Sequence, residues 1–148
     1  MNRERWKDIP GYEGYYQISN LGRVRSKNRI IKIKDCIGKK YSINRKSVNR
    51  KIRTQKNGYC YIGLSIKDKE KVFLIHRLVA ISFIPNIHNK PQVNHKDGNK
   101  LNNYVKNLEW CTELENKQHA KINGLNYKHK HKAMFKKGHI PWNKKLKN

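Results

Sequence analysis

A single histidine, His95, stands in a stretch rich in asparagine, QVNHKDGNKLNNYVKNLEWCT, which runs from Gln92 to Thr112 and contains five asparagines. An imidazole with a pKa of about 6.5 can take a proton from water at neutral pH. The amide oxygens of Asn94 and Asn116 are ligands that Mg²⁺ accepts while it keeps several waters. Together these groups could hydrolyse a phosphodiester, with the histidine as general base and a hard cation polarising the phosphate.

Two strands and a helix must position these side chains. The sequence predicts a strand that ends on His95, a tight polar loop KDGNKLNN, and a second strand YVKNLEWC. Thr112 followed by Glu115 matches a capping box, which predicts a helix over about 113–121. A strand, strand, helix unit of this kind brings Asn116 within reach of His95.

Each of these side chains also has an ordinary structural interpretation. A lone histidine in a polar loop is more often a surface residue than a base, and asparagine pairs more often form turns than bind metals. Asp97 is open to a turn role or a ligand role, with the turn favoured, and His119 is a further open contributor. His76 is interpreted as a buried, satisfied residue in preference to a phosphate contact. The predicted turn formers are Asn99, Asn102 and Asn103.

The charge of the chain indicates a polyanionic partner. The 148 residues carry 35 Lys and Arg against 10 Asp and Glu, a net charge of +25. Such a charge repels itself in a compact protein, and displacing counterions from nucleic acid phosphates is the usual reason to carry it. The alternative explanation of the charge is a surface that only keeps the protein soluble. With 36% hydrophobic residues, the chain is expected to form one compact module with a small core and extensions.

We do not expect a membrane-spanning protein or a protein stabilised by disulfides. No apolar run approaches the roughly 20 residues of a spanning helix, and the first residues lack the apolar core of a signal peptide. The cysteines, Cys36, Cys60 and Cys111, are odd in number and widely separated, so we expect them to be reduced. Cys60 and Cys111 lie in apolar patterns typical of core positions.

Short apolar runs predict the remaining elements. The first segment alternates through Tyr16, Ile18 and Val24, and further on through Ile30 or Ile31 and then Ile33, which predicts a small antiparallel meander. The segment 35–55 is basic and without clear period, so an irregular loop that orders only on DNA is expected. The segment KVFLIHRLVAISFI fits a strand or a helix, and we favour a hairpin that feeds a short helix ending before Pro85.

These runs resemble a known family. The stretch VNHKDGNKLNNYVKNLEWCTELENKQHA resembles the HNH nuclease motif, the ββα-metal fold of phage and intron-encoded homing endonucleases. The upstream WKDIPGYEGYYQISNLGRVRS is similar to the NUMOD4 DNA-binding module, and FKKGHIPWNKK is similar to a tail motif of phage nucleases. The resemblance implies an α+β fold with an N-terminal β meander at 1–34, an insertion at 35–55, a nuclease core at 56–122 with its ββα motif at 92–121, and a basic extension at 123–148.

The resemblance also implies a role for each site residue. His95 matches the general base, and Asn107 matches the central asparagine that braces the loop and so orients the histidine. Asn116 matches the metal-binding position on the helix, and Asn94 matches the position where many members carry Asp as the other ligand. One Mg²⁺ or Mn²⁺ ion per site is implied. Because Asn94 brings no negative charge, metal affinity is expected to be low without DNA.

The implied function is a DNA endonuclease that nicks one strand of double-stranded DNA per active site, in the cytoplasm of a bacterial or phage-infected cell. A monomer is favoured, a dimer stays open, and no small-molecule cofactor is expected. The alternatives are a non-catalytic nucleic-acid-binding protein or regulator on a decayed HNH scaffold, and a ribosomal or RNA-packaging protein. The predicted DNA contacts are Arg23, Arg25, Lys27 and Arg29, and in the tail Lys128, Lys130, Lys132, Lys136, Lys137, Lys144 and Lys145.

Overall fold

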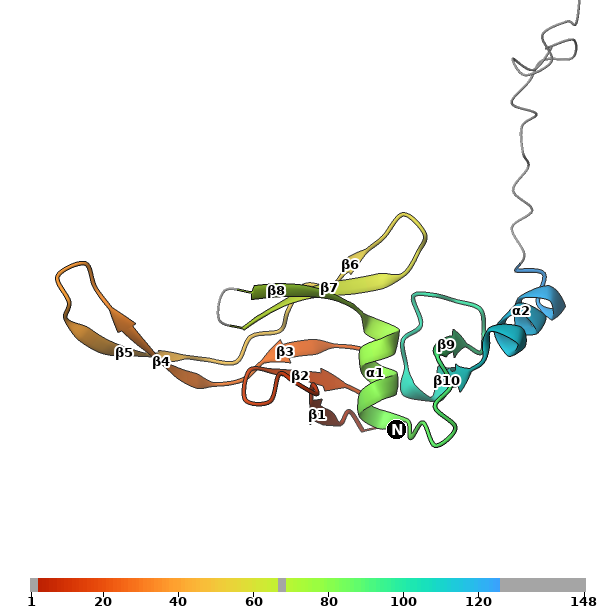
Figure 1. Cartoon of the computed structure of the whole chain (residues 1–148), viewed down its shortest axis with the longest axis horizontal. Coiled ribbons are helices and arrows are strands. Elements are labelled where there is room, and N and C mark those ends of the chain that lie inside the picture. Colours follow the sequence, from red (N-terminus) through yellow and green to blue (C-terminus); the bar gives the residue numbers. More distant parts are fainter. Residues whose placement is uncertain (1–2, 67–68, 126–148) are drawn as a thin grey trace, which may run out of the picture.

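The computed structural model describes residues 3–66 and 69–125, in which ten strands and two α-helices form an α+β fold (Figure 1). The N-terminal strands are β1 (Trp6–Asp8), β2 (Tyr16–Ser19), β3 (Val24–Ser26), β4 (Arg29–Lys34), β5 (Lys40–Arg45), β6 (Arg53–Thr54), β7 (Cys60–Ile66) and β8 (Lys69–Leu74). The elements that follow are α1 (Ile75–Phe83), β9 (Gln92–His95), the 3₁₀ helix η1 (Val105–Asn107), β10 (Leu108–Cys111) and α2 (Glu113–Ile122). The α+β class predicted from the sequence is confirmed.

Small antiparallel sheets surround a central helix. The sheets have the strand orders β1-β2-β3, β4-β5, β6-β7-β8 and β10-β9. Helix α1 lies between the N-terminal sheets and the β9–β10 pair, and it contacts strands on both sides (Figure 1). None of the sheets within the described ranges is large enough to enclose a core of its own, so the helix supplies a shared one.

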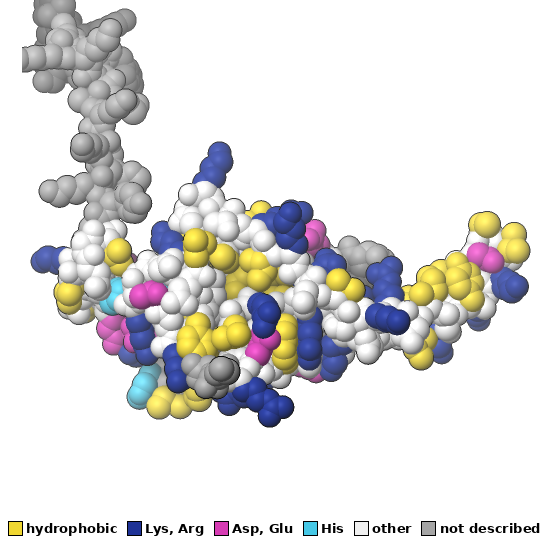
Figure 2. All heavy atoms as spheres, turned by 180° about the vertical axis from the view of Figure 1, so that it is seen from behind, with side chains coloured by type: hydrophobic (Ala, Val, Ile, Leu, Met, Phe, Trp, Pro, Cys, Tyr) yellow, Lys and Arg dark blue, Asp and Glu magenta, His cyan; other side chains and the backbone are white. Residues whose placement is uncertain are grey.

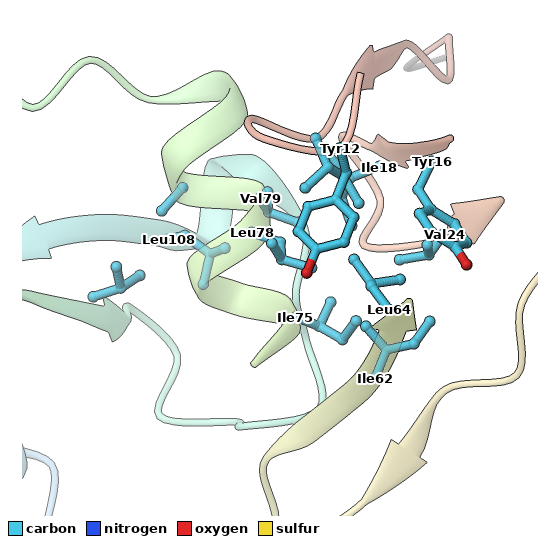
Figure 3. Packing of buried hydrophobic residues seen from close by; sticks show 13 residues of the cluster. Tyr12, Tyr16, Ile18, Val24, Ile62, Leu64, Ile75, Leu78, Val79 and Leu108 are labelled. Atoms are coloured by element: carbon cyan, nitrogen blue, oxygen red, sulfur yellow. The ribbon is translucent and has the colours of Figure 1, made fainter. Parts of the chain in front are cut away.

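The core forms around one face of α1. Ile75, Leu78 and Val79 follow the i, i+3, i+4 spacing of a helical face and are buried. On one side they pack toward Ile62 and Leu64 of β7, and Leu108 lies on the other side (Figure 3). The helix ends before Pro85, as predicted, because a residue that precedes proline is disfavoured in the α conformation.

The strand, strand, helix unit predicted around His95 is present. Strand β9 ends on His95, and β10 pairs with it antiparallel. Thr112 accepts the N–H of Glu115 at 3.2 Å, and the Glu115 carboxylate accepts the N–H of Thr112 at 2.7 Å. These two contacts form the predicted capping box at the start of α2. The second strand is shorter than predicted, because η1 occupies Val105–Asn107.

Two predictions about the N-terminal part are wrong. The residues Ile30 to Ile33 do not continue the meander, because β4 pairs only with β5 and projects from the body as a hairpin (Figure 1). The basic segment 35–55 is not irregular, since it contains β5 and β6. A tight turn closes the hairpin: the Asp35 carboxylate accepts the backbone N–H of Ile37 at 3.1 Å and of Lys39 at 2.8 Å.

The hairpin keeps apolar side chains on its surface. The strands pair Ile31 with Ile43 and Ile33 with Tyr41, yet Tyr41 and Ile43 remain more than a third exposed. Figure 2 shows these apolar atoms along the arm that projects from the body. The strand at β4 was predicted from its alternation, which matches its alternating half-buried and exposed positions, whereas β5 was not predicted and every one of its residues is exposed.

Neither helix of the described part is long and apolar enough to cross a membrane. The three cysteines are free, and Cys111 is buried as predicted, whereas Cys60 is half-buried. The body of the protein is therefore held by the shared core and by strand pairing in the described residues.

We expect Leu78→Ala to lower the free energy of unfolding by about 2–5 kcal/mol, since it opens a cavity in the core that the N-terminal sheets share with the β9–β10 pair. Leu78 is 3% exposed. Urea denaturation followed by circular dichroism measures the change. Ile81→Ala on the same helix is the control, because Ile81 is 52% exposed and its truncation should cost only about 0.5 kcal/mol. Equal losses in both variants would contradict the shared core.

Candidate active site

The pairing of β9 with β10 places the predicted site residues. In this register Asn94 faces Glu109 across the ladder, and His95 faces Leu108. The His95 side chain is 4% exposed and that of Asn94 is 8% exposed. Asn116 lies on α2, which packs against β9. The structure thus brings together the three residues that the sequence analysis grouped.

These side chains line a cavity of about 230 Å³ between the β9–β10 pair and α2. Lysines and histidines contribute to its wall, and Tyr59 lines it from the β6–β7 turn. The lining residues are Tyr59, Val93, Asn94, His95, Gly98, Lys100, Asn116, Lys117, His119, Ala120 and Leu125.

A hydrogen bond fixes the tautomer of His95. The Asn103 Nδ2 donates to the carbonyl of Leu101 at 3.1 Å, so the Asn103 Oδ1 faces the imidazole. That oxygen lies 3.2 Å from the His95 Nε2 and can only accept, which places the ring proton on Nε2. The Nδ1 of a neutral His95 is therefore the atom with a free lone pair. Asn103 is thus more than the turn former that its sequence context suggested.

Burial lowers the pKa of His95 and so favours its neutral form at pH 7. The Asn103 hydrogen bond and the Asp97 charge act in the opposite direction, whereas the charge of Lys100 lowers the pKa further. A base must be unprotonated to accept a proton, so this balance keeps His95 ready to do so.

Two aromatic rings pack against the His95 imidazole. The centroid of the His76 ring is 5.1 Å away in an edge-on arrangement, and that of Tyr59 is 6.1 Å away. His76 is 5% exposed, and its Nδ1 has no hydrogen-bond partner among the described residues. The prediction that His76 is buried is confirmed, but the prediction that it is satisfied is wrong for this nitrogen. Burial lowers its pKa to about 4, with smaller effects from His95 and Arg77.

Asn107 connects the two ends of the loop that follows His95. Its Nδ2 donates to Asp97 Oδ1 and to the Asn102 carbonyl, both at 2.8 Å, and its Oδ1 accepts the Asp97 N–H at 3.1 Å. Asp97 also accepts from Asn102, which is a turn role. These are contacts that a brace would make, while the part of Asn107 in catalysis stays a prediction.

The amide oxygens of Asn94 and Asn116 remain available for a cation. The Asn94 Nδ2 donates to Glu109 at 3.1 Å and the Asn116 Nδ2 donates to Gln92 at 2.8 Å. Neither Oδ1 has a hydrogen-bond partner within the described ranges. Oxygen donors of this kind fit Mg²⁺ or Mn²⁺. No three His, Cys, Asp or Glu side chains of the described part gather as a metal cluster.

The His119 side chain contacts the loop that follows β9 and is not hydrogen-bonded to the amide oxygens of Asn94 and Asn116. Its Nε2 lies 2.9 Å from the carbonyl oxygen of Lys96, which makes it a donor to the backbone. It lines the cavity with its remaining surface. A metal role for His119 stays an open prediction.

The N-terminal cations predicted to contact DNA are already engaged within the protein. Arg23 is paired with Glu4, and Lys27 with Asp8 at 3.0 Å. Arg25 donates to Gln17 and lies over the ring of Trp6, and Arg29 lies over the ring of Tyr15. The tail lysines, Lys128, Lys130, Lys132, Lys136, Lys137, Lys144 and Lys145, lie outside the described residues.

Sequence reasoning missed three neighbours of the site. The sequence around Asn103 indicated only a turn. Tyr59 is 36 residues upstream of His95, so no local pattern connects it with the histidine. Glu109 was part of the predicted strand, and strand register could have found it, since Asn94 and Glu109 face each other once β9 ends on His95. The register of the β9–β10 hairpin is therefore the sequence signal that could have identified Glu109 as a neighbour of Asn94.

Known sequences resemble the chain over most of its length. The NUMOD4 motif matches residues 4–65 and the HNH endonuclease family matches residues 73–118. DNA endonuclease I-HmuI of Bacillus phage SP01 is 41% identical over 119 residues, which are 80% of this chain and 59% of that protein. Uncharacterized HNH endonuclease L245 of Acanthamoeba polyphaga mimivirus is 39% identical over 82% of this chain and 31% of its own length.

A solved structure extends the comparison to the fold. The structure of DNA binding and cleavage by the HNH homing endonuclease I-HmuI matches with a TM-score of 0.63 at 41% identity, over 81% of this chain and 59% of that chain. This chain therefore spans less than two thirds of the relatives it matches. The NUMOD4 match includes the segment 35–55 that the sequence analysis set apart, and the predicted boundaries at 34, 55 and 122 stay predictions.

We expect the stability of the protein to fall between pH 6.5 and pH 4 because of His76. The unfolded imidazole binds a proton near pH 6.5, whereas the folded one resists protonation down to about pH 4. Acidification in this window therefore favours the unfolded state, by about 3 kcal/mol for the whole shift. His76→Phe removes the titration and keeps a ring, so its stability should depend less on pH. Urea midpoints at several pH values test this, and parallel curves for the two proteins would contradict it.

Proposed function

The chain belongs to the HNH endonuclease family, and on that premise we propose that it is a metal-dependent DNA endonuclease. The observation that carries the proposal is that a buried, neutral His95 and the side chains of Asn94 and Asn116 line one cavity. That set supplies a base and two cation ligands at the same place.

His95 is the general base of the proposed reaction. Its Nδ1 accepts a proton from the water that attacks the phosphorus, while Nε2 keeps its proton on the Asn103 oxygen. Asn103 thereby stabilises the imidazolium that forms. The rings of Tyr59 and His76 hold the imidazole plane and limit water around it.

Asn94 and Asn116 are the proposed ligands of one Mg²⁺ or Mn²⁺ ion. When bound, such an ion polarises the scissile phosphate and stabilises the leaving oxygen. Glu109 accepts the Asn94 amide and so orients the Asn94 oxygen, and its carboxylate adds negative charge behind a neutral ligand. Gln92 holds the Asn116 amide in the same way. The substrate phosphate would complete the ligand set, so affinity for the ion would rise with DNA.

Double-stranded DNA is the proposed substrate. A second cavity, of about 870 Å³, lies where the β4–β5 hairpin leaves the body, and the described residues that line it include five cations and no carboxylate. A surface of this kind suits a phosphate backbone. Of the predicted DNA contacts within the described residues, only Arg29 lines this cavity. The cations of this wall are Arg29, Lys32, Arg45, Lys46 and Arg50.

One active site per chain fits the nicking of one strand. A monomer needs a second event, or a second copy, to break both strands. We propose that the reaction takes place in the cytoplasm of a bacterial or phage-infected cell, where double-stranded DNA is found. The relatives are longer than this chain, so the activity, substrate and partners of the whole protein are part of the proposal.

We expect the protein to nick supercoiled plasmid DNA in Mg²⁺ or Mn²⁺, and His95→Ala to lower the rate by at least about 100-fold, the usual contribution of a general base. Gel electrophoresis of relaxed and linear forms measures the rate. His88→Ala is the control, since His88 is exposed and does not line the cavity. Binding without nicking in any divalent metal would favour the non-catalytic alternative.

We expect Asn103→Asp to move the acid limb of the pH–rate profile to higher pH. The carboxylate still accepts the His95 Nε2–H, but its charge favours the imidazolium and so raises the pKa of the base. The rate at pH 8 should stay within about tenfold of the wild type, whereas the rate at pH 6 should fall further. An unmoved limb would mean that Asn103 does not act on the base.

A further inference from the structure

We propose that Lys100 is a further catalytic residue, whose ammonium group stabilises the negative charge that grows on the scissile phosphate. This inference rests on the proposed nuclease function and adds a role that the base and the metal ligands do not fill. Lys100 lies in the loop between β9 and β10 and lines the same cavity as His95 and Asn116.

The Lys100 charge is available to a substrate. Within residues 3–66 and 69–125, no carboxylate pairs with its ammonium group. Lys117, the other lysine of the cavity wall, is paired with Glu113 at its own helix. Lys100 is therefore the cavity lysine whose charge is not already neutralised by the described residues. A phosphodiester that enters the cavity brings the missing anion.

The Lys100 side chain is held before any substrate binds. Its Nζ donates to the Asn57 carbonyl at 2.9 Å and lies 4.6 Å from the centroid of the Tyr59 ring. Gly58 lies against the stem of the lysine: a Cβ built there would be 3.4 Å from the Lys100 Cδ, and its φ of +88° suits glycine. A free surface lysine would lose rotamer freedom on binding, whereas this one has already lost it.

Preorganised charge of this kind acts mainly on the transition state. As the oxygen of water bonds to phosphorus and the bond to the leaving oxygen breaks, negative charge grows on the non-bridging oxygens. The proton of water passes to His95, and the leaving oxygen takes a proton from solvent. A fixed ammonium group balances the phosphate charge without reorganising. One donor removed from such a site costs on the order of 100-fold in rate.

The groups that hold Lys100 come from a different segment of the chain. Asn57, Gly58 and Tyr59 form the turn between β6 and β7, inside the NUMOD4 match, whereas Lys100 lies inside the HNH match. Tyr59 also packs against His95 and His76. The N-terminal module thus contributes to the active site itself, through a turn that positions a catalytic cation.

The test separates chemistry from binding in the full chain. Single-turnover cleavage of plasmid DNA at saturating protein in Mg²⁺ measures chemistry, and fluorescence anisotropy of a labelled duplex without divalent metal measures affinity. We expect Lys100→Met to slow cleavage by about 10- to 100-fold and to change the dissociation constant by less than about threefold, because it removes one of 35 cationic residues. Lys100→Arg should restore part of the rate, since it returns the charge.

Lys96→Met is the matched control. It removes the same charge from the same loop, but Lys96 is exposed and its side chain does not line the cavity. Its rate and affinity should stay within about twofold of the wild type. Thermal unfolding of all variants shows whether Lys100 merely holds the β6–β7 turn.

Several outcomes would overturn the assignment. They are an unchanged rate in Lys100→Met, an equal loss of rate in Lys96→Met, a loss of affinity that matches the loss of rate, or a slow Lys100→Arg together with reduced stability. If the wild type cleaves and Lys100→Met cleaves equally, only this inference fails. If the wild type does not cleave DNA that it binds, the proposed function fails as well.

Discussion

The burial of helix α1 is the constraint on which the rest of the structure depends. The three-stranded sheets and the β9–β10 pair are each too small to exclude water alone, and Ile75, Leu78 and Val79 give them a common core. The same helix carries His76, so packing the core also places that ring against His95. The site is therefore assembled by long-range packing as well as by the local ββα unit.

A buried base is costly to build, and its neighbours reflect that cost. The His95 imidazole is removed from water, and its Nε2 is satisfied by Asn103, while Nδ1 keeps the lone pair that the proposed reaction uses. His76 beside it is buried with a nitrogen that no described residue satisfies. Burial lowers the pKa of both imidazoles, and the neighbouring His95 lowers the pKa of His76 further, so the neutral form of each ring is favoured at pH 7. The burial that favours neutral imidazoles also lowers the local dielectric constant, and a lower dielectric constant strengthens every charge interaction in the site.

Local signals predicted the parts of the fold that local chemistry determines. The capping box at Thr112 and Glu115 gave the start of α2, and the apolar spacing before Pro85 gave α1. The alternation of Ile31 and Ile33 predicted a strand at β4, but β5 and its pairing with β4 were missed, because every residue of β5 is exposed and the hairpin is stabilised by strand pairing and a turn. In the site, the grouping of Asn94, His95 and Asn116 followed from the order of elements. Tyr59 and Lys100 could not be connected from the sequence, since they meet only after two distant turns pack together.

The central claim is that Asn94 and Asn116 hold a catalytic cation beside His95. Anomalous diffraction from crystals of the full chain with duplex DNA and Mn²⁺ tests it most directly, because the scattering locates the ion independently of the protein. We expect one peak at about 2.1 Å from both amide oxygens, the ligand distance of an octahedral divalent cation, with a phosphate oxygen as a further ligand. A peak on Asp97 or on Glu109, with Asn94 and Asn116 out of reach, would contradict it.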